Sequence, residues 1–170
     1  IPEEIFYEKN IPIYTVENED SLIRKSGEKL NFSGSFENKY IKDLNFSIPN
    51  PKTFLLLSKD ISNYKINIDI KSNQIKEKII DVQTTLNLSP IKNNFEKINT
   101  KIVYSTIIEL TDRITDKKEI EKIILINVPS DIYPELRKIF VFVFEKSGFK
   151  DIKISENVDF QKLYNLKKIQ

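Results

Sequence analysis

Between positions 36 and 110, apolar side chains recur at every second position in four segments, and this alternation constrains the fold more than any other feature. In the clearest segment, Tyr64, Ile66, Ile68 and Ile70 alternate with polar residues. A period of two is typical of a strand with one buried face. Because the links between the segments are short, we predict an antiparallel sheet of four strands. They cover about Phe36–Ile48, Tyr64–Lys71, Lys76–Leu88 and Phe95–Leu110.

The two faces of this predicted sheet differ in polarity. In the first strand Tyr40, Leu44, Phe46 and Ile48 are expected on the apolar side, with Lys42 interrupting, and Pro49-Asn50-Pro51 ends the strand. We expect Phe54–Leu57 in a loop after it. The opposite face is expected to be solvated because it carries Asn67, Asp69, Asp81, Gln83, Thr85, Asn99 and Lys101.

After Leu110 the apolar period becomes helical. One helix is predicted over Asp116–Asn127, and Pro129 is expected to break it. Ser130 would then cap a second helix that runs to about Ser147, with Gly148 at the position after its end. A last helix is predicted from about Asn157 to Lys168. The fold class is α+β, with helices packed on one face of the sheet.

The second of these helices is apolar on two sides. One stripe would cover the sheet and consists of Ile132, Leu136, Ile139, Phe140 and Val143. Val141 and Phe142 lie off this stripe, and exposed apolar area of this kind favours an interface. The second contact could be a subunit or another part of this chain. We expect Val141 and Phe142 to form a subunit interface.

Composition argues against catalysis. The chain has no Cys, no His and three Gly, which removes thiolate chemistry, the usual general base and a phosphate-binding glycine loop. The charged run Thr111–Glu121 lacks the spacing of a calcium loop. We therefore expect no enzyme activity, no metal and no cofactor. Since 27 basic residues face 25 acidic ones, nucleic acid is not implied.

The first 35 residues are polar and mixed in pattern, so we interpret them as an N-terminal extension, partly disordered, before a domain over residues 36–170. A short helix is predicted around Glu19–Lys25. The start Ile1–Tyr7 does not have the pattern of a secretory signal, and no apolar run is long enough for a membrane span. We expect a cytoplasmic protein that does not insert into membranes.

Several segments resemble the SecB family of protein-export chaperones, in the right order and over about Phe36–Tyr164. Tyr40–Phe46, followed by Pro49-Asn50-Pro51, resembles the family's first strand and the proline-rich segment after it. Val128–Arg137 is similar to the start of the family's main helix. Lys146–Phe149 resembles the Gly-Phe segment that ends this helix in the family. Asn157–Phe160 and Leu163-Tyr164 resemble the family's closing segment. The family's loop Trp is absent, and Ile61 is the nearest bulky residue.

The resemblance implies a homotetramer, a dimer of dimers, that holds unfolded precursor proteins without ATP and passes them to a SecA-type translocation ATPase. It assigns polypeptide binding to Phe54, Leu55, Leu56, Leu57 and Ile61. It assigns docking of the ATPase to Asp43, with Asn45 and Glu96 as further candidates. The family's second acidic position in the first strand is Ser47 here, and its acidic position in the fourth strand aligns with Lys97, next to Glu96.

Two other functions stay open at the level of sequence. A chaperone of the same fold could serve one client only, such as an antitoxin, and the altered acidic positions favour this. A sheet-based nucleic-acid-binding module would need aromatic and basic side chains together on the solvated face.

Overall fold

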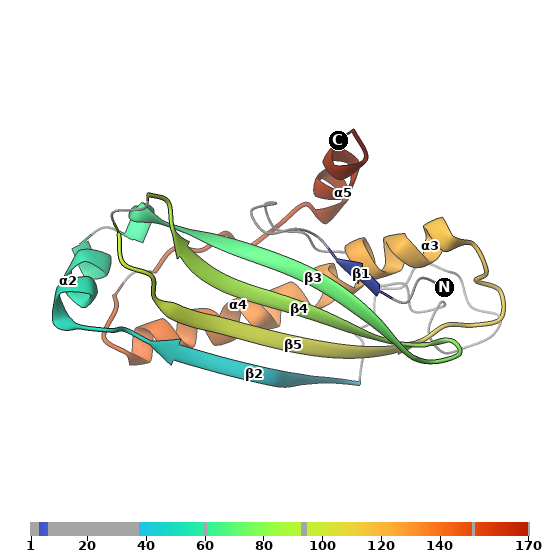
Figure 1. The fold of residues 1–170 in the computed structure, drawn as a ribbon, viewed down its shortest axis with the longest axis horizontal. Helices are drawn as coiled ribbons and strands as arrows, with labels where there is room; N and C mark the ends of the chain where they lie inside the picture. The colour runs from blue at the N-terminus through green and yellow to red at the C-terminus, as the bar shows by residue number, and fades with distance from the viewer. Residues whose placement is uncertain (1–3, 7–37, 60, 93–94, 151, 170) are drawn as a thin grey trace.

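A computed structural model describes residues 4–6, 38–59, 61–92, 95–150 and 152–169, and shows one antiparallel sheet with helices against one face (Figure 1). The four predicted strands are confirmed, and together with one further strand they form a five-stranded sheet in the order β1-β3-β4-β5-β2. A short strand from the predicted extension adds to the edge of β3. The strands are β1 (Glu4–Phe6), β2 (Lys39–Ser47), β3 (Tyr64–Lys76), β4 (Ile79–Pro90) and β5 (Asn99–Glu109). The predicted helix at Glu19–Lys25 lies outside the described residues.

The core lies between this sheet and helix α4 (Val128–Lys146), which runs along one face of it (Figure 1). Residues paired across an antiparallel ladder share a face, and Leu86 is opposite both Ile68 and Ile102. All three are buried, as the alternation predicts. The other face carries Asp81, which accepts a hydrogen bond from Gln83 and another from Ser105. No helix in the described part of the chain covers that face, which we call the open face (Figure 1).

A β-bulge changes the pattern of β2. Ile41 is opposite Tyr104 and Asp43 is opposite Val103, so Lys42 is the additional residue. An additional residue reverses the alternation on one side of the bulge. Leu44 therefore faces the helices, whereas Tyr40, opposite Ser105, lies on the open face. The prediction that Tyr40 and Leu44 share a side was wrong for this reason.

The segment predicted as a loop after β2 is helix α2 (Pro51–Lys59), followed by one 3-10 turn, η1 (Ile61–Asn63). Proline at the first helical position costs no hydrogen bond. The preceding Asn50 caps the helix, since its Oδ1 accepts from the backbone N–H of Thr53 at 2.8 Å. The segment Pro49-Asn50-Pro51 therefore both ends the strand and begins a helix. The prediction of a loop recognised the first role and missed the second.

Pro129 does not break the helix. Helix α3 (Lys117–Lys122), a π-helical turn η2 (Ile123–Asn127) and α4 follow one another with no residue between them. In the π turn, the N–H of Val128 bonds to the carbonyl of Ile123. This turn shifts the hydrogen-bond register just before Pro129, which then lies in the first turn of α4, where its missing N–H is tolerated. Ser130 is therefore inside the helix and is not its N-cap.

The predicted end of α4 is confirmed. Ser147 is the C-cap, and Gly148 takes a φ of 99°, a conformation that favours glycine. The N–H of Phe149 then bonds to the carbonyl of Phe144 at 3.1 Å. The last helix, α5 (Phe160–Ile169), begins three residues later than predicted. The side chain of Asp159 accepts from the N–H of Lys162 at that start.

Substitution of Phe140 and of Phe142 tests which face of α4 contributes to the stability of the fold. Phe140 is buried and Phe142 is 58% exposed. We expect Phe140→Ala to lower the free energy of unfolding by about 3–5 kcal/mol, because it leaves a cavity under the sheet. Chemical denaturation followed by circular dichroism measures this loss.

Phe142→Ala is the matched control for Phe140→Ala. Its effect should be small, about 0.5 kcal/mol, or should depend on protein concentration if Phe142 contacts a second subunit. Equal, concentration-independent losses for the two variants would contradict this arrangement of the helix.

Candidate functional site

Helix α2 presents an apolar surface at one end of the sheet. Leu55 is 64% exposed and Leu56 is 39% exposed. Phe54 is half-buried and its ring lies 4.8 Å from that of Phe149, centroid to centroid. Helical spacing turns Thr53 and Leu57 toward the core, and Leu57 is only 2% exposed.

The five residues expected to bind polypeptide are thus divided by the helix. Leu55 and Leu56 are available at the surface, and Phe54 and Ile61 are half-buried against the core. Leu57 belongs to the core itself, so its side chain does not face solvent. A loop prediction could not make this distinction, because only a helix gives the four-residue spacing.

The carboxylate of Glu96 anchors α2 and does not stand free as a docking charge. Its Oε2 accepts hydrogen bonds from Thr53 Oγ1 at 2.7 Å and from Asn50 Nδ2 at 2.8 Å. These two bonds, that from Thr53 first, hold the pKa of the Glu96 carboxyl below its ordinary value. The backbone carbonyl of Glu96 also accepts from the hydroxyl of Tyr64 at 2.7 Å. Glu96 therefore joins the start of α2 to the sheet.

Asp43 and Asn45 lie side by side on the open face, and the structure brings them together as a pair. Asn45 Nδ2 donates to Asp43 Oδ2 at 2.9 Å. Lys101 Nζ, on the neighbouring strand, lies 3.9 Å from the same oxygen. The negative charge of Asp43 is thus partly balanced, and Glu96 is engaged elsewhere. The open face near Asp43 carries charges of both signs.

A second exposed apolar surface lies where β2 and α4 meet. Phe142 is largely exposed, and Val141 is half-buried and packs against the core. Ile41 and Leu44 of β2 are also exposed, although both are on the helix side of the sheet. Sequence analysis missed these two because alternation shows which side chains share a face and does not show that a strand lies at the edge.

The described residues offer exposed apolar surfaces for binding. Among them no group of His, Cys, Asp and Glu is arranged to hold a metal ion. In the same part of the chain, no helix combines the length and apolar character needed to cross a membrane. The exposed apolar surfaces, together with the fold, define a protein-binding α+β domain.

Comparison with known proteins identifies the family. The sequence model of the preprotein translocase subunit SecB matches residues 28–170. The chain therefore belongs to the SecB family and has a chaperone role in protein export. These matches do not support the alternatives of a chaperone for a single client or of a nucleic-acid-binding module.

Curated relatives agree with this assignment. A putative protein-export protein SecB of Pelagibacter ubique is 40% identical over 125 residues, which cover 74% of this chain and 89% of that protein. The protein-export protein SecB of Anaplasma phagocytophilum is 26% identical over 138 residues, 74% of this chain and 87% of that protein. That of Orientia tsutsugamushi (strain Boryong) is 26% identical over 126 residues, 74% of this chain and 77% of that protein.

The bonds of Glu96 predict how stability depends on pH. A lowered pKa means that Glu96 stabilises the fold above its unfolded pKa, near 4.5, and that this contribution is lost as the pH falls through the folded pKa. We expect Glu96→Gln to lower the melting temperature at neutral pH and to have a diminishing effect as the pH falls below 4.5. Melting curves across this range measure the difference.

Glu109→Gln serves as the control, because Glu109 is an exposed carboxylate at the end of β5. It should change the melting temperature little at any pH. If the melting temperatures of Glu96→Gln and the unsubstituted chain differ by the same amount at all pH values, the Glu96 carboxylate does not have the role given to it.

Proposed function

We propose that this chain is an ATP-independent chaperone that binds unfolded precursor proteins and passes them to a SecA-type translocation ATPase. The observation that carries the proposal is the exposed apolar surface of α2, made by Leu55 and Leu56 and bordered by Phe54. Membership of the SecB family supports it. The relatives are named for protein export. Burial of apolar side chains, the form of binding proposed here, does not need a nucleotide.

The physical basis is burial of apolar area. An unfolded client exposes apolar side chains, and covering them stabilises a complex by about 25 cal/mol for each Å² removed from water. Leu55 and Leu56 project from a helix whose base is fixed by Glu96 and by the contact of Phe54 with Phe149. A rigid apolar surface of this kind recognises hydrophobicity with little sequence preference, because leucine side chains offer no directional hydrogen bond.

This proposal predicts that acidic substitutions on α2 abolish holding of clients. We expect the chain to suppress aggregation of a reduced, unfolded client at a near-stoichiometric ratio without nucleotide. The double variant Leu55→Asp/Leu56→Asp should lose most of this activity, since charged groups resist burial. Light scattering of the diluted client measures aggregation.

Leu166→Asp provides the matched control, because Leu166 is also an exposed leucine on a helix, in α5. It should leave the activity intact. Full activity of the double variant, or equal loss in the control, would show that α2 is not the client surface.

For the assembly, we propose a homotetramer, a dimer of dimers, that uses the surface where β2 and α4 meet. β2 is the last strand in the sheet, so one of its edges has no strand partner among the described residues. Ile41, Leu44 and Phe142 expose apolar area beside this edge. Contact with a second copy would pair the edge and cover that area.

The oligomeric state is tested by Phe142→Asp. We expect this variant to have a smaller mass in light scattering with unchanged circular dichroism, because a buried carboxylate at an interface costs several kcal/mol. Val141→Asp also disturbs the core, since Val141 packs against it, and is less informative.

Ile91→Asp is the control for Phe142→Asp, as Ile91 is similarly exposed in the loop after β4. It should keep the original mass. If Phe142→Asp also keeps it, the second apolar side of α4 is not a subunit interface.

For docking of the ATPase, we propose the open face around Asp43 and Asn45. Glu96 is a weaker candidate, since its carboxylate bonds to Asn50 and Thr53. Because Lys101 lies beside Asp43, attraction for a basic segment should be reduced. We place this protein in the cytoplasm, where a chaperone of this class meets newly made precursors.

A further inference from the structure

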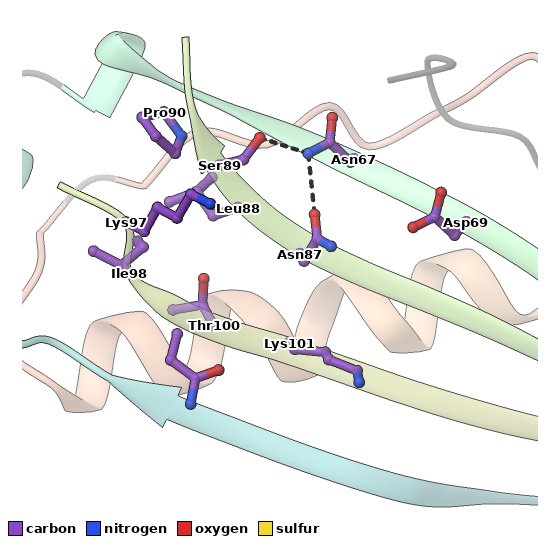
Figure 2. A pocket seen from close by; sticks show the side chains of 11 residues that line it. Asn67, Asp69, Asn87, Leu88, Ser89, Pro90, Lys97, Ile98, Thr100 and Lys101 are labelled. Atoms are coloured by element: carbon purple, nitrogen blue, oxygen red, sulfur yellow. Dashed lines mark hydrogen bonds between the residues drawn. The ribbon is translucent and has the colours of Figure 1, made fainter. Parts of the chain in front are cut away.

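The two central strands separate at one end of the sheet. Pairing between β4 and β5 ends at Asn87 and Lys101, although pairing of β3 with β4 continues as far as Tyr64 and Pro90. β2 likewise stays paired with β5 as far as Ser47 and Asn99. A cleft of about 310 Å³ opens where β4 and β5 diverge (Figure 2). The backbones that border it have no ladder partner across the gap among the described residues.

One wall of the cleft is a fixed polar surface. The side chain of Asn67 is almost fully buried, and its Nδ2 donates to Asn87 Oδ1 at 3.0 Å and to Ser89 Oγ at 2.7 Å (Figure 2). These bonds hold the amide of Asn87 and the hydroxyl of Ser89 in place. Both groups line the cleft and retain further hydrogen-bonding capacity.

The hydroxyl of Thr100 does not face the open side of the cleft. Thr100 borders the cleft and is opposite Phe46, so its side chain shares the helix side of the sheet with Ile102. Its Oγ1 is buried and makes no hydrogen bond within the described part of the chain. The polar groups that a ligand in the cleft could reach are therefore those held by Asn67 and the charged side chains on the open face.

The cleft also holds positive charge. Lys97 and Lys101 both line it, and Asp69 is the acidic residue among its lining. Lys101 is close to Asp43, whereas Lys97 has no ion-pair partner among the residues that the structure describes. Lys97 is therefore the cation best placed to take a carboxylate from a ligand.

We propose that this cleft binds a short extended segment of a partner protein through its backbone and one acidic side chain. Strands in a sheet lie about 4.8 Å apart, so the space between two diverging strands suits another extended chain. The peptide groups would bond to Asn87 and Ser89, and the carboxylate to Lys97. Binding in this cleft is polar, whereas the proposed binding of clients to α2 is apolar. The cleft selects acidic segments, whereas the proposed docking site at Asp43 would select basic ones.

Two short synthetic peptides test the proposal on the full chain. One is fluorescein-Thr-Asp-Ile-Asp-Thr-amide and the other replaces both Asp with Lys. We expect binding of the acidic peptide, measured by fluorescence polarisation, and much weaker binding of the basic one. Lys97→Glu should weaken the acidic peptide about tenfold. Lys92→Glu, in the same loop but outside the cleft, should not weaken it.

Thr100→Val is a control for the face of the sheet that binds. It removes the unpaired hydroxyl on the helix side at nearly constant shape, so we expect unchanged or higher stability and unchanged peptide binding. The Leu55→Asp/Leu56→Asp variant should bind the acidic peptide normally, which distinguishes this site from the client surface. The proposal is overturned by equal binding of the two peptides, by no binding, by equal effects of Lys97→Glu and Lys92→Glu, or by complete displacement with inorganic phosphate.

Discussion

The packing of α4 across one face of the sheet is the contact on which the rest of the structure depends. Phe140 and Phe144 place their rings 4.8 Å apart on the buried side of the helix, and Phe144 meets Phe46 of β2 at 5.0 Å. This packing spans strands that are far apart in the sequence. It holds β2, which has a single strand neighbour among the described residues, against the core.

The same contact determines where function can lie. Because the helices cover one face, most of the polar side chains of the sheet are on the open face, and the separation of β4 from β5 is exposed there. Because Phe149 follows the end of α4 and packs against Phe54, the position of α2 depends on where α4 ends. Glu96 completes the attachment from the side of the sheet. The proposed client surface thus belongs to a helix that is fixed both at its apolar base and at its polar start.

Much of the fold follows from simple periodicity. The alternation from Tyr64 to Ile70 identifies a strand and its buried face, and Gly148 identifies the end of α4. These features depend on local chemistry. The errors at Tyr40 and Pro129 have a different origin, since each involves one residue of additional length, a bulge in β2 and a π turn before α4. A pattern rule counts residues at a fixed period and cannot detect such an insertion.

The candidate sites were less predictable than the fold. Leu55 and Leu56 were singled out as part of an apolar run, but only the helix separates them from Leu57. The role of Glu96 needs Asn50 and Thr53, more than forty residues away along the chain. The cleft between β4 and β5 depends on where their ladder stops pairing, and no local pattern encodes that point.

The π turn at Ile123–Asn127 has a consequence for how members of this family can change in length. Consecutive residues of an α-helix are about 100° apart around its axis. Loss of one residue here would turn α3 about α4 by that angle and move Ile120, now buried, away from the core. Insertions and deletions should therefore be tolerated in the loops and strongly selected against in this turn, even when the apolar character of the segment is kept.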